Sequence, residues 1–249
     1  MTLPRRFLGL WLGCTAVLIG AFLIGFLSTV RQQSIDSLYA TTNTRLAEIV
    51  ILRIDEPSIG ALGQWPWPRA VFADTINALQ NAKVIGIDVN FKEPSRVGLA
   101  DDSRFVTALQ KSRVPVVLTA DRQNAGVIVL PLAILRTVAQ TGIANLPVDA
   151  DGVIRRVTLG EQTDASFGLV VSRFAHGQES KTQSPPTDTT RIVYHGRDKT
   201  FTAFSLVDVL HGAVPSRFFQ NKIVLIGATV TDLQDYHQTP LGLMSGVEI

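Results

Sequence analysis

Three aspartates come at or shortly after the ends of three apolar segments that have the composition of buried β-strands. Asp55 ends the segment 48–55, Asp88 ends the segment KVIGID, and Asp235 follows the segment 221–230. In an open α/β sheet the carboxyl ends of parallel strands share one edge, and ligand pockets form outside that edge. Carboxylates gathered there would suit a hard cation or a polar ligand.

Each aspartate also has a simpler explanation, because Asp side chains accept hydrogen bonds from backbone N–H groups at the start of helices and turns. The sequence DEPS, which begins at Asp55, is typical of such a cap. His237 lies two residues after Asp235 and could bind a metal, act as a base or be an ordinary loop residue. The sequence therefore predicts either a site that contains Asp55, Asp88, Asp235 and His237 or a set of caps, and it identifies no particular metal or cofactor.

A rigid aromatic segment, QWPWPR, contains two of the three tryptophans in the chain. Proline fixes φ near −65° and restricts the residue before it, so Trp65 and Trp67 are predicted to be extended. Their indole rings could close one edge of a core or stack on a ligand. Arg69 could pair with a strand-end aspartate or receive an anionic group. Trp65, Trp67 and Arg69 therefore join the candidate ligand-binding residues.

Common catalytic motifs are absent from the sequence, so no catalytic residue is predicted. There is no H-E-x-x-H motif, no pair of cysteines, no G-x-S-x-G motif and no Walker loop. The remaining histidines lack the spacing of metal ligands: His176, His195 and His211. One enzymatic alternative stays open, a membrane-anchored metal-dependent hydrolase that uses Asp55, Asp88 and His237.

The N-terminal region contains an apolar segment, 7–30, without a single charged residue. As a helix it would be about 36 Å long, enough to cross a membrane, and it is too long for the apolar part of a signal peptide. Arg5 and Arg6 precede it, which favours a cytoplasmic N-terminus. We therefore predict a cytoplasmic stub and transmembrane helix over 1–30 and an extracytoplasmic domain over 31–249.

Charge and cysteine content restrict the partners of the predicted outer domain. Apart from Arg5 and Arg6, 21 basic residues balance 21 acidic ones, which argues against binding to nucleic acid. The only cysteine, Cys14, lies in the apolar segment, so the outer domain has no disulfide. Small residues four apart, such as Gly9 and Gly13, would allow two membrane helices to form a homodimer, although small residues are common in such helices for other reasons.

Apolar segments alternate with amphipathic ones along the rest of the chain. The predicted strands are 48–55, 83–91, 114–120, 191–196 and 221–230, and the predicted helices are 68–80, 101–111, 166–176 and 204–212. The first strand, helix and second strand are typical of a βαβ unit with parallel strands. The sequence therefore predicts an α/β fold with a mixed, partly parallel sheet flanked by helices and preceded by one transmembrane helix.

Four segments follow one another along the chain: IDEPSIGALGQWPWPRAVFADTINAL, VIGIDVNFKEPS, DADGVIRRV and KIVLIGATVTDLQDYHQTPLGLMSGVEI. Together they resemble the CHASE type 2 domain, an extracytoplasmic sensory module of bacterial transmembrane receptors. The resemblance covers nearly the whole chain in order. The residues that match recurrent positions of the family are Asp55, Trp65, Trp67, Arg69, Asp88, Asp235 and Pro240.

This resemblance implies a sensor in the bacterial inner membrane, with its domain in the periplasm and a small molecule or an ion as ligand. It also implies further membrane helices and a cytoplasmic output module, such as a nucleotide cyclase, a diguanylate cyclase or a kinase. The sequence ends at Ile249, about where the family turns back to the membrane, so we expect either a fragment of a receptor or a chain without its output module. Besides the hydrolase, a structural or partner-binding envelope domain is an alternative.

Overall fold

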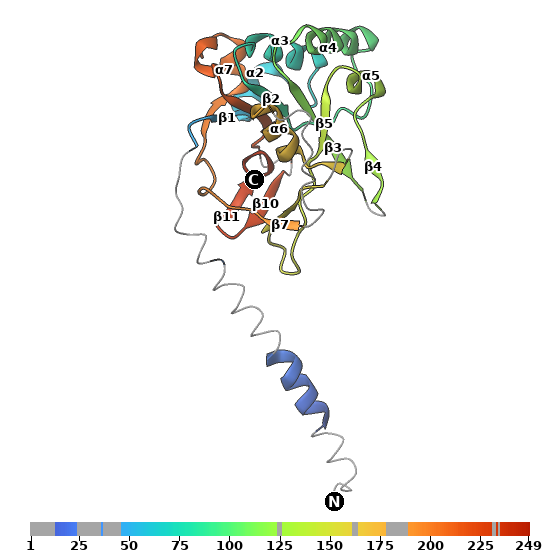
Figure 1. The fold of residues 1–249 in the computed structure, drawn as a ribbon, viewed down its shortest axis with the longest axis vertical. Helices are drawn as coiled ribbons and strands as arrows, with labels where there is room; N and C mark the ends of the chain where they lie inside the picture. Colours follow the sequence, from blue (N-terminus) through green and yellow to red (C-terminus); the bar gives the residue numbers. More distant parts are fainter. Residues whose placement is uncertain are drawn as a thin grey trace, which may run out of the picture. The chain divides into compact units, whose positions relative to one another are not determined.

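The computed structural model describes residues 13–23, 36, 46–123, 126–160, 164–177, 189–230, 233 and 235–249 (Figure 1). The chain divides into two units, Met1–Thr42 and Asn43–Ile249. Residues 13–23 of the first unit are helical. Within the described residues, no helix has the length and apolar character needed to cross a membrane. Most of the predicted span 7–30 lies outside the described residues, so that span stays a prediction.

A seven-stranded sheet forms the centre of the second unit, with strand order β4-β3-β2-β9-β1-β8 and with β5 also paired to β3 (Figure 1). The strands are β1 (Ile49–Ile54), β2 (Val84–Ile87), β3 (Val116–Arg122), β4 (Ile128–Val129), β5 (Gln140–Ile143), β8 (Thr202–Ser205) and β9 (Ile223–Ala228). Every pair is parallel except β3 with β4. The predicted α/β fold with a mixed, partly parallel sheet is confirmed.

The order of the central strands differs from the simple βαβ unit that the sequence suggests. Strands β1 and β2 are parallel, but β9 lies between them and pairs with both, so that Ile223 is opposite Ile49 on one side and Val84 on the other. These three strands are rich in β-branched residues and almost wholly buried, as strands covered on both faces are. The centre of the sheet is thus built from segments far apart in the chain.

Helices cover the two faces of the sheet unequally (Figure 1). The larger core lies on one face, where Ile85 and Ile87 of β2 pack with Phe72 and Phe105. The helices on this face are α2 (Glu56–Leu62), α3 (Arg69–Ala78), α4 (Leu99–Lys111), α5 (Ala133–Arg136) and α7 (Leu206–Leu210). On the other face Val84 belongs to a smaller cluster with residues of α6 (Phe167–Ala175). Side chains therefore alternate between a thick core and a thin one along each strand.

Outside the main sheet, the described residues form two further antiparallel strand pairs and two 3₁₀-helices. Strand β6 (Arg156–Thr158) pairs with β7 (Thr189–Arg191), and β10 (Tyr236–Thr239) pairs with β11 (Gly242–Ser245). The 3₁₀-helices are η3 (Ser216–Phe219) and η5 (Gly246–Glu248). The predicted strand 191–196 is wrong, because β7 ends at Arg191 and Tyr194 is instead buried as a hydrogen-bond donor to Ile154 O at 2.8 Å.

The start of α3 is capped by a residue of another helix. Pro68, at the cap position, makes no side-chain cap, and the carboxylate of Asp101 in α4 takes this role. It accepts hydrogen bonds from the backbone N–H groups of Arg69 at 2.6 Å and Ala70 at 2.8 Å. Burial by itself would raise the pKa of Asp101, but these bonds and one from Ser95 Oγ lower it. The segment that holds the tryptophans is thereby fixed to α4.

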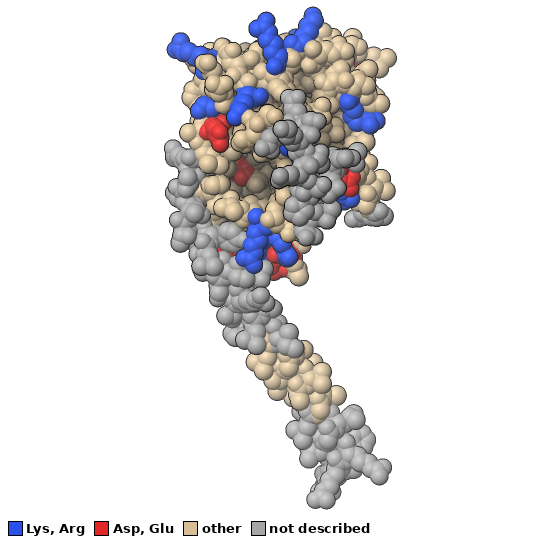
Figure 2. Space-filling view, viewed as in Figure 1, with Lys and Arg blue, Asp and Glu red and all other residues tan. Residues whose placement is uncertain are grey.

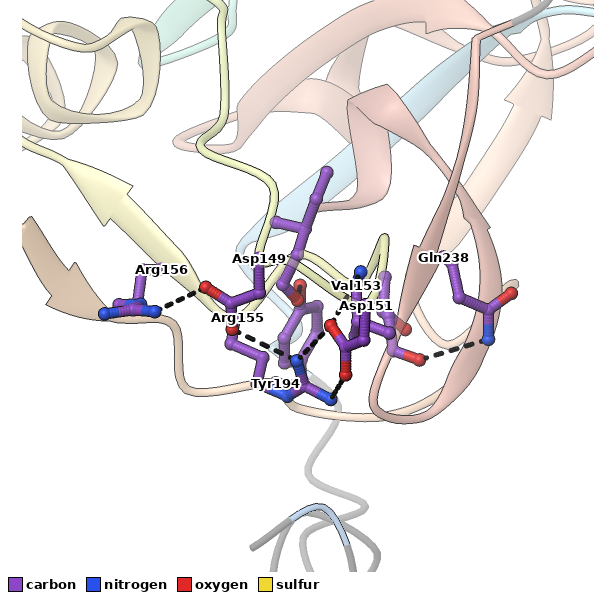
Figure 3. A network of polar contacts seen from close by, with 9 residues as sticks. Asp149, Asp151, Val153, Arg155, Arg156, Tyr194 and Gln238 are labelled. Carbon is purple, nitrogen blue, oxygen red and sulfur yellow. Dashed lines mark hydrogen bonds and ion pairs between the residues drawn. The ribbon is translucent and has the colours of Figure 1, made fainter. Parts of the chain in front are cut away.

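A network around Arg155 holds the turn 149–152 (Figure 3). Arg155 is almost fully buried, and its guanidinium donates to Asp149 Oδ2 at 3.0 Å and to Asp151 Oδ2 at 2.9 Å. The neighbouring Arg156 reaches the second oxygen of Asp149 at 2.5 Å. Because Arg156 opens β6, the network ties this turn to the β6–β7 pair.

Candidate functional site

A cleft of about 460 Å³ lies at the edge of the sheet where the strands β2, β3 and β9 end. Its walls include residues that directly follow or end these strands and part of the tryptophan segment. The lining residues are Trp65, Pro66, Trp67, Arg69, Phe72, Asp88, Val89, Asn90, Thr119, Asp121, Ala228, Leu233 and Asp235. This is the place where ligands bind in open α/β sheets.

Five of the seven candidate residues lie together in this cleft: Trp65, Trp67, Arg69, Asp88 and Asp235. His237 is next to it, with its Nε2 3.3 Å from Asp235 Oδ1. The cleft also contains Asp121, Asn90 and Thr119, which the sequence analysis missed. Asp121 lies near the end of β3, so the rule that selected Asp88 would have found it had it been applied to every predicted strand.

Asp55 lies elsewhere and acts as the cap that its sequence suggests. Its carboxylate accepts hydrogen bonds from Ser58 N at 3.2 Å, Ser58 Oγ at 2.8 Å and Ser205 Oγ at 2.7 Å. These bonds join the start of α2 to the end of β8. Among the described residues, no group of three or more Asp, Glu, His or Cys side chains is placed to hold a metal ion. The structure therefore does not assemble the Asp55, Asp88 and His237 site of the hydrolase alternative.

The two tryptophans differ in their surroundings. Trp67 is only 2% exposed and donates from Nε1 to Gly63 O at 2.9 Å, so it belongs to the core. Trp65 is half-buried and meets Trp67 edge to face, with ring centroids 5.2 Å apart. The peptide bond between Trp65 and Pro66 is cis. Trp67 thus fixes this corner of the core, while Trp65 leaves part of its ring at the cleft.

The guanidinium group of Arg69 contacts three groups of the protein itself. Its Nε lies 3.6 Å from Asp102 Oδ1, its Nη2 donates to Glu93 O at 2.8 Å, and its guanidinium carbon lies 4.6 Å from the centre of the Phe91 ring. Burial lowers the pKa of Arg69, and the nearby Asp102 and Asp101 oppose this. The partner of Arg69 is therefore an aspartate of α4 rather than a strand-end aspartate.

Burial and the charges of two neighbouring carboxylates both act on Asp88 in the cleft. Burial, followed by the charges of Asp235 and Asp121, raises the pKa of Asp88 from 3.8 to about 7, and His237 opposes this. Asn90 Nδ2 donates to Asp121 Oδ2. The pKa of His237 is raised mainly by its hydrogen bond to Asp235. A positively charged group in the cleft would relieve this repulsion.

The raised pKa of Asp88 predicts a pH dependence of stability. Between about pH 4 and pH 7 the folded protein retains a proton on Asp88 that the unfolded chain has lost, so stability falls as the pH rises, by up to roughly 4 kcal/mol. Asp88→Asn should make the free energy of unfolding, measured in urea at a series of pH values, fall less steeply over this interval. The exposed Asp208→Asn serves as the control, and equal slopes in both variants would contradict the prediction.

Comparison with protein families agrees with this architecture. A family model described as the CHASE2 domain matches residues 13–249. Searches of curated proteins and of solved structures found no match. CHASE2 domains are extracellular sensory domains of signalling receptors and are associated with membranes. Because the match covers almost the entire sequence, the chain belongs to the CHASE2 family.

Proposed function

We propose that this chain is the periplasmic sensor of a membrane receptor and that a small organic cation binds in the cleft at the carboxyl edge of the sheet. The charge of the cleft carries the proposal. Asp88, Asp121 and Asp235 line it, whereas the only Lys or Arg among its described lining residues is Arg69, which is paired with Asp102. Asp235 contacts His237 and Asp121 accepts a hydrogen bond from Asn90, but no lysine or arginine of the described lining pairs with the three carboxylates, so a cation would meet a surplus of negative charge.

The walls favour an organic cation over a metal ion. The volume of about 460 Å³ is within the range of small-molecule sites. Trp65 contributes an indole ring, and aromatic rings attract organic cations. The described acidic side chains do not converge as metal ligands do. An amine or quaternary ammonium group beside Asp88 and Asp235 satisfies all three observations.

A ligand at Asp235 is also well placed to affect the C-terminal segment. The backbone carbonyl of Asp235 accepts a hydrogen bond from Gly246 N at 2.9 Å, and Val247 packs so closely on Gly227 of β9 that a Cβ at Gly227 would lie 2.6 Å from Val247 Cβ. A ligand that binds one arrangement of these groups more tightly would shift the population toward it. We propose that this shift is passed through membrane helices, in a homodimer, to a cytoplasmic output module.

Calorimetric titration of the full chain with putrescine, choline and Ca²⁺ tests the proposal. We expect at least one of the two organic cations to bind and to change the tryptophan fluorescence, because Trp65 lies in the cleft. Asp235→Asn should weaken that binding about tenfold or more, as expected for loss of a charged partner, and Asp208→Asn should not. Binding of Ca²⁺ alone would replace the organic cation by a metal ion. No binding at all would overturn the proposal in favour of a partner-binding domain.

A further inference from the structure

A second cavity, of about 510 Å³, lies on the α6 side of the sheet. Its floor is the sheet itself, through Ile49, Ile223 and Leu225. Helix α6 forms one wall, the β6–β7 pair and the residues after it form another, and η5 borders it near the C-terminal end of the described chain. These walls are distinct from those of the acidic cleft, and Asp88 is the one residue that lines both.

The residues that line the cavity reach from one edge of the sheet to the other. Glu48, directly before β1, and His176, directly after α6, lie at the amino edge of the sheet. Asp88, directly after β2, lies at the carboxyl edge. A six-residue strand such as β1 is about 20 Å long, so the lining extends over roughly that distance.

Apolar side chains dominate the lining, yet several of them are not covered by protein. Leu146, Leu159, Ile192 and Leu225 are only half-buried although they lie between two layers of the domain. Protein interiors are normally packed without voids of this size, and each exposed apolar side chain forgoes about 25 cal/mol per Å² of burial. A cavity of a few hundred Å³ with apolar walls and a few polar groups has the properties of a small-molecule site.

The charged groups indicate what kind of head group would fit. The ionisable side chains of the lining are Glu48 and His176 at the amino edge, Asp88 at the carboxyl edge, and Arg191, which ends β7 and is exposed. Arg191 is thus a single cation in a lining that also has two carboxylates. Neither end offers a cluster of cations for an anionic head group. An uncharged head group that donates and accepts hydrogen bonds fits either end, and a chain fits the apolar walls between them.

We propose that this cavity binds a single-chain amphiphile with an uncharged, hydroxyl-bearing head group, with its chain along the α6 side of the sheet. The proposal does not rest on the organic cation, since it involves other walls and other chemistry. The two ligands could occupy the domain together, one on each side of Asp88.

Photoaffinity labelling of the full chain tests this proposal. The probe is a long-chain alcohol with a diazirine on its chain, and labelled peptides are identified by mass spectrometry. We expect saturable labelling of the segments that line the cavity, residues 143–159, 166–176 and 191–193, which unlabelled 1-dodecanol competes away. The apolar helix 13–23 is the internal reference, because labelling there by simple partitioning would not be competed away.

Two matched serine variants show whether the labelled place is this cavity. Ser172 is exposed on α6 and lines the cavity, so Ser172→Trp should obstruct it with little effect on folding and reduce the competed labelling at least fivefold. Ser103 is exposed on α4, on the other face of the sheet, so Ser103→Trp should leave the labelling unchanged. Labelling that 1-dodecanol does not compete away, or that Ser172→Trp does not reduce, would overturn the proposal. The calorimetric result for the acidic cleft is independent of either outcome.

Discussion

Trp67→Ala is expected to lower the free energy of unfolding by roughly 3–5 kcal/mol, the usual cost of removing a large buried aromatic side chain. The ring is 2% exposed and packs with Trp65 and Phe72, at centroid distances of 5.2 and 6.5 Å. Its Nε1 donates to Gly63 O, so alanine would also leave that carbonyl without its partner. Urea unfolding followed by far-ultraviolet circular dichroism measures the effect.

Two variants separate packing from the hydrogen bond. Trp67→Phe keeps most of the aromatic volume and loses the Nε1 donor, so it should cost less than alanine. Trp65→Ala removes a ring that is only half-buried and should cost clearly less than Trp67→Ala. A stability of Trp67→Ala equal to that of the unchanged protein would show that this corner of the core is not packed around Trp67.

Arg155→Ala is expected to cost a similar amount, roughly 3–5 kcal/mol, for an electrostatic reason. Removing Arg155 takes away the buried partner of the Asp149 carboxylate, which would then keep the more exposed Arg156 in a poorly solvated place. The side chain of Arg155 is 5% exposed and that of Asp149 is 10% exposed, so Asp149 could not regain full hydration. Figure 3 shows that Asp149 and Asp151 both point toward the guanidinium.

Arg156→Ala is the matched control for this prediction. Arg156 is the next residue and also pairs with Asp149, but its side chain is 51% exposed, so its loss should cost about 1 kcal/mol or less. Burial would raise the pKa of Asp149, but the bonds from Arg156 and Arg155 lower it, so their stabilisation is present at neutral pH and is lost as the pH falls. Arg155→Ala should therefore weaken the acid dependence of stability. Equal costs for the two arginine variants would contradict a special role for the buried pair.

Elements with strong local signals could be predicted from the sequence. The apolar segments of β1, β2, β3 and β9 indicate buried strands, and the structure confirms them. The position of β9 between β1 and β2 could not be predicted. All three strands are buried and similar in composition, so their sequences do not show which of them are neighbours in the sheet. Strand β8 was missed because its sequence, TAFS, is short and partly exposed at the edge of the sheet.

The candidate site could also be predicted only in part, where local sequence determines the position of a residue. The rule that ligands gather at the carboxyl edge places Asp88 and Asp235 correctly beside the cleft, because it depends only on strand direction. The rule fails for Asp55, because Ser58 and Ser205 donate hydrogen bonds to its carboxylate. Ser205 is 150 residues away in the chain, so this contact could not be predicted locally. The pairing of Arg69 with Asp102 could not be predicted either, because it depends on the packing of α3 against α4, which the local sequence pattern does not show.

The central place of β9 has a consequence for protein synthesis. During synthesis β1 and β2 are made more than a hundred residues before β9. The backbone N–H and C=O groups that later pair with β9 therefore lack this partner until about residue 228 has been made. Open edges of apolar strands pair readily with other chains. The growing polypeptide is therefore exposed to misassembly until β9 has been made, and folding chaperones would be most valuable before that point.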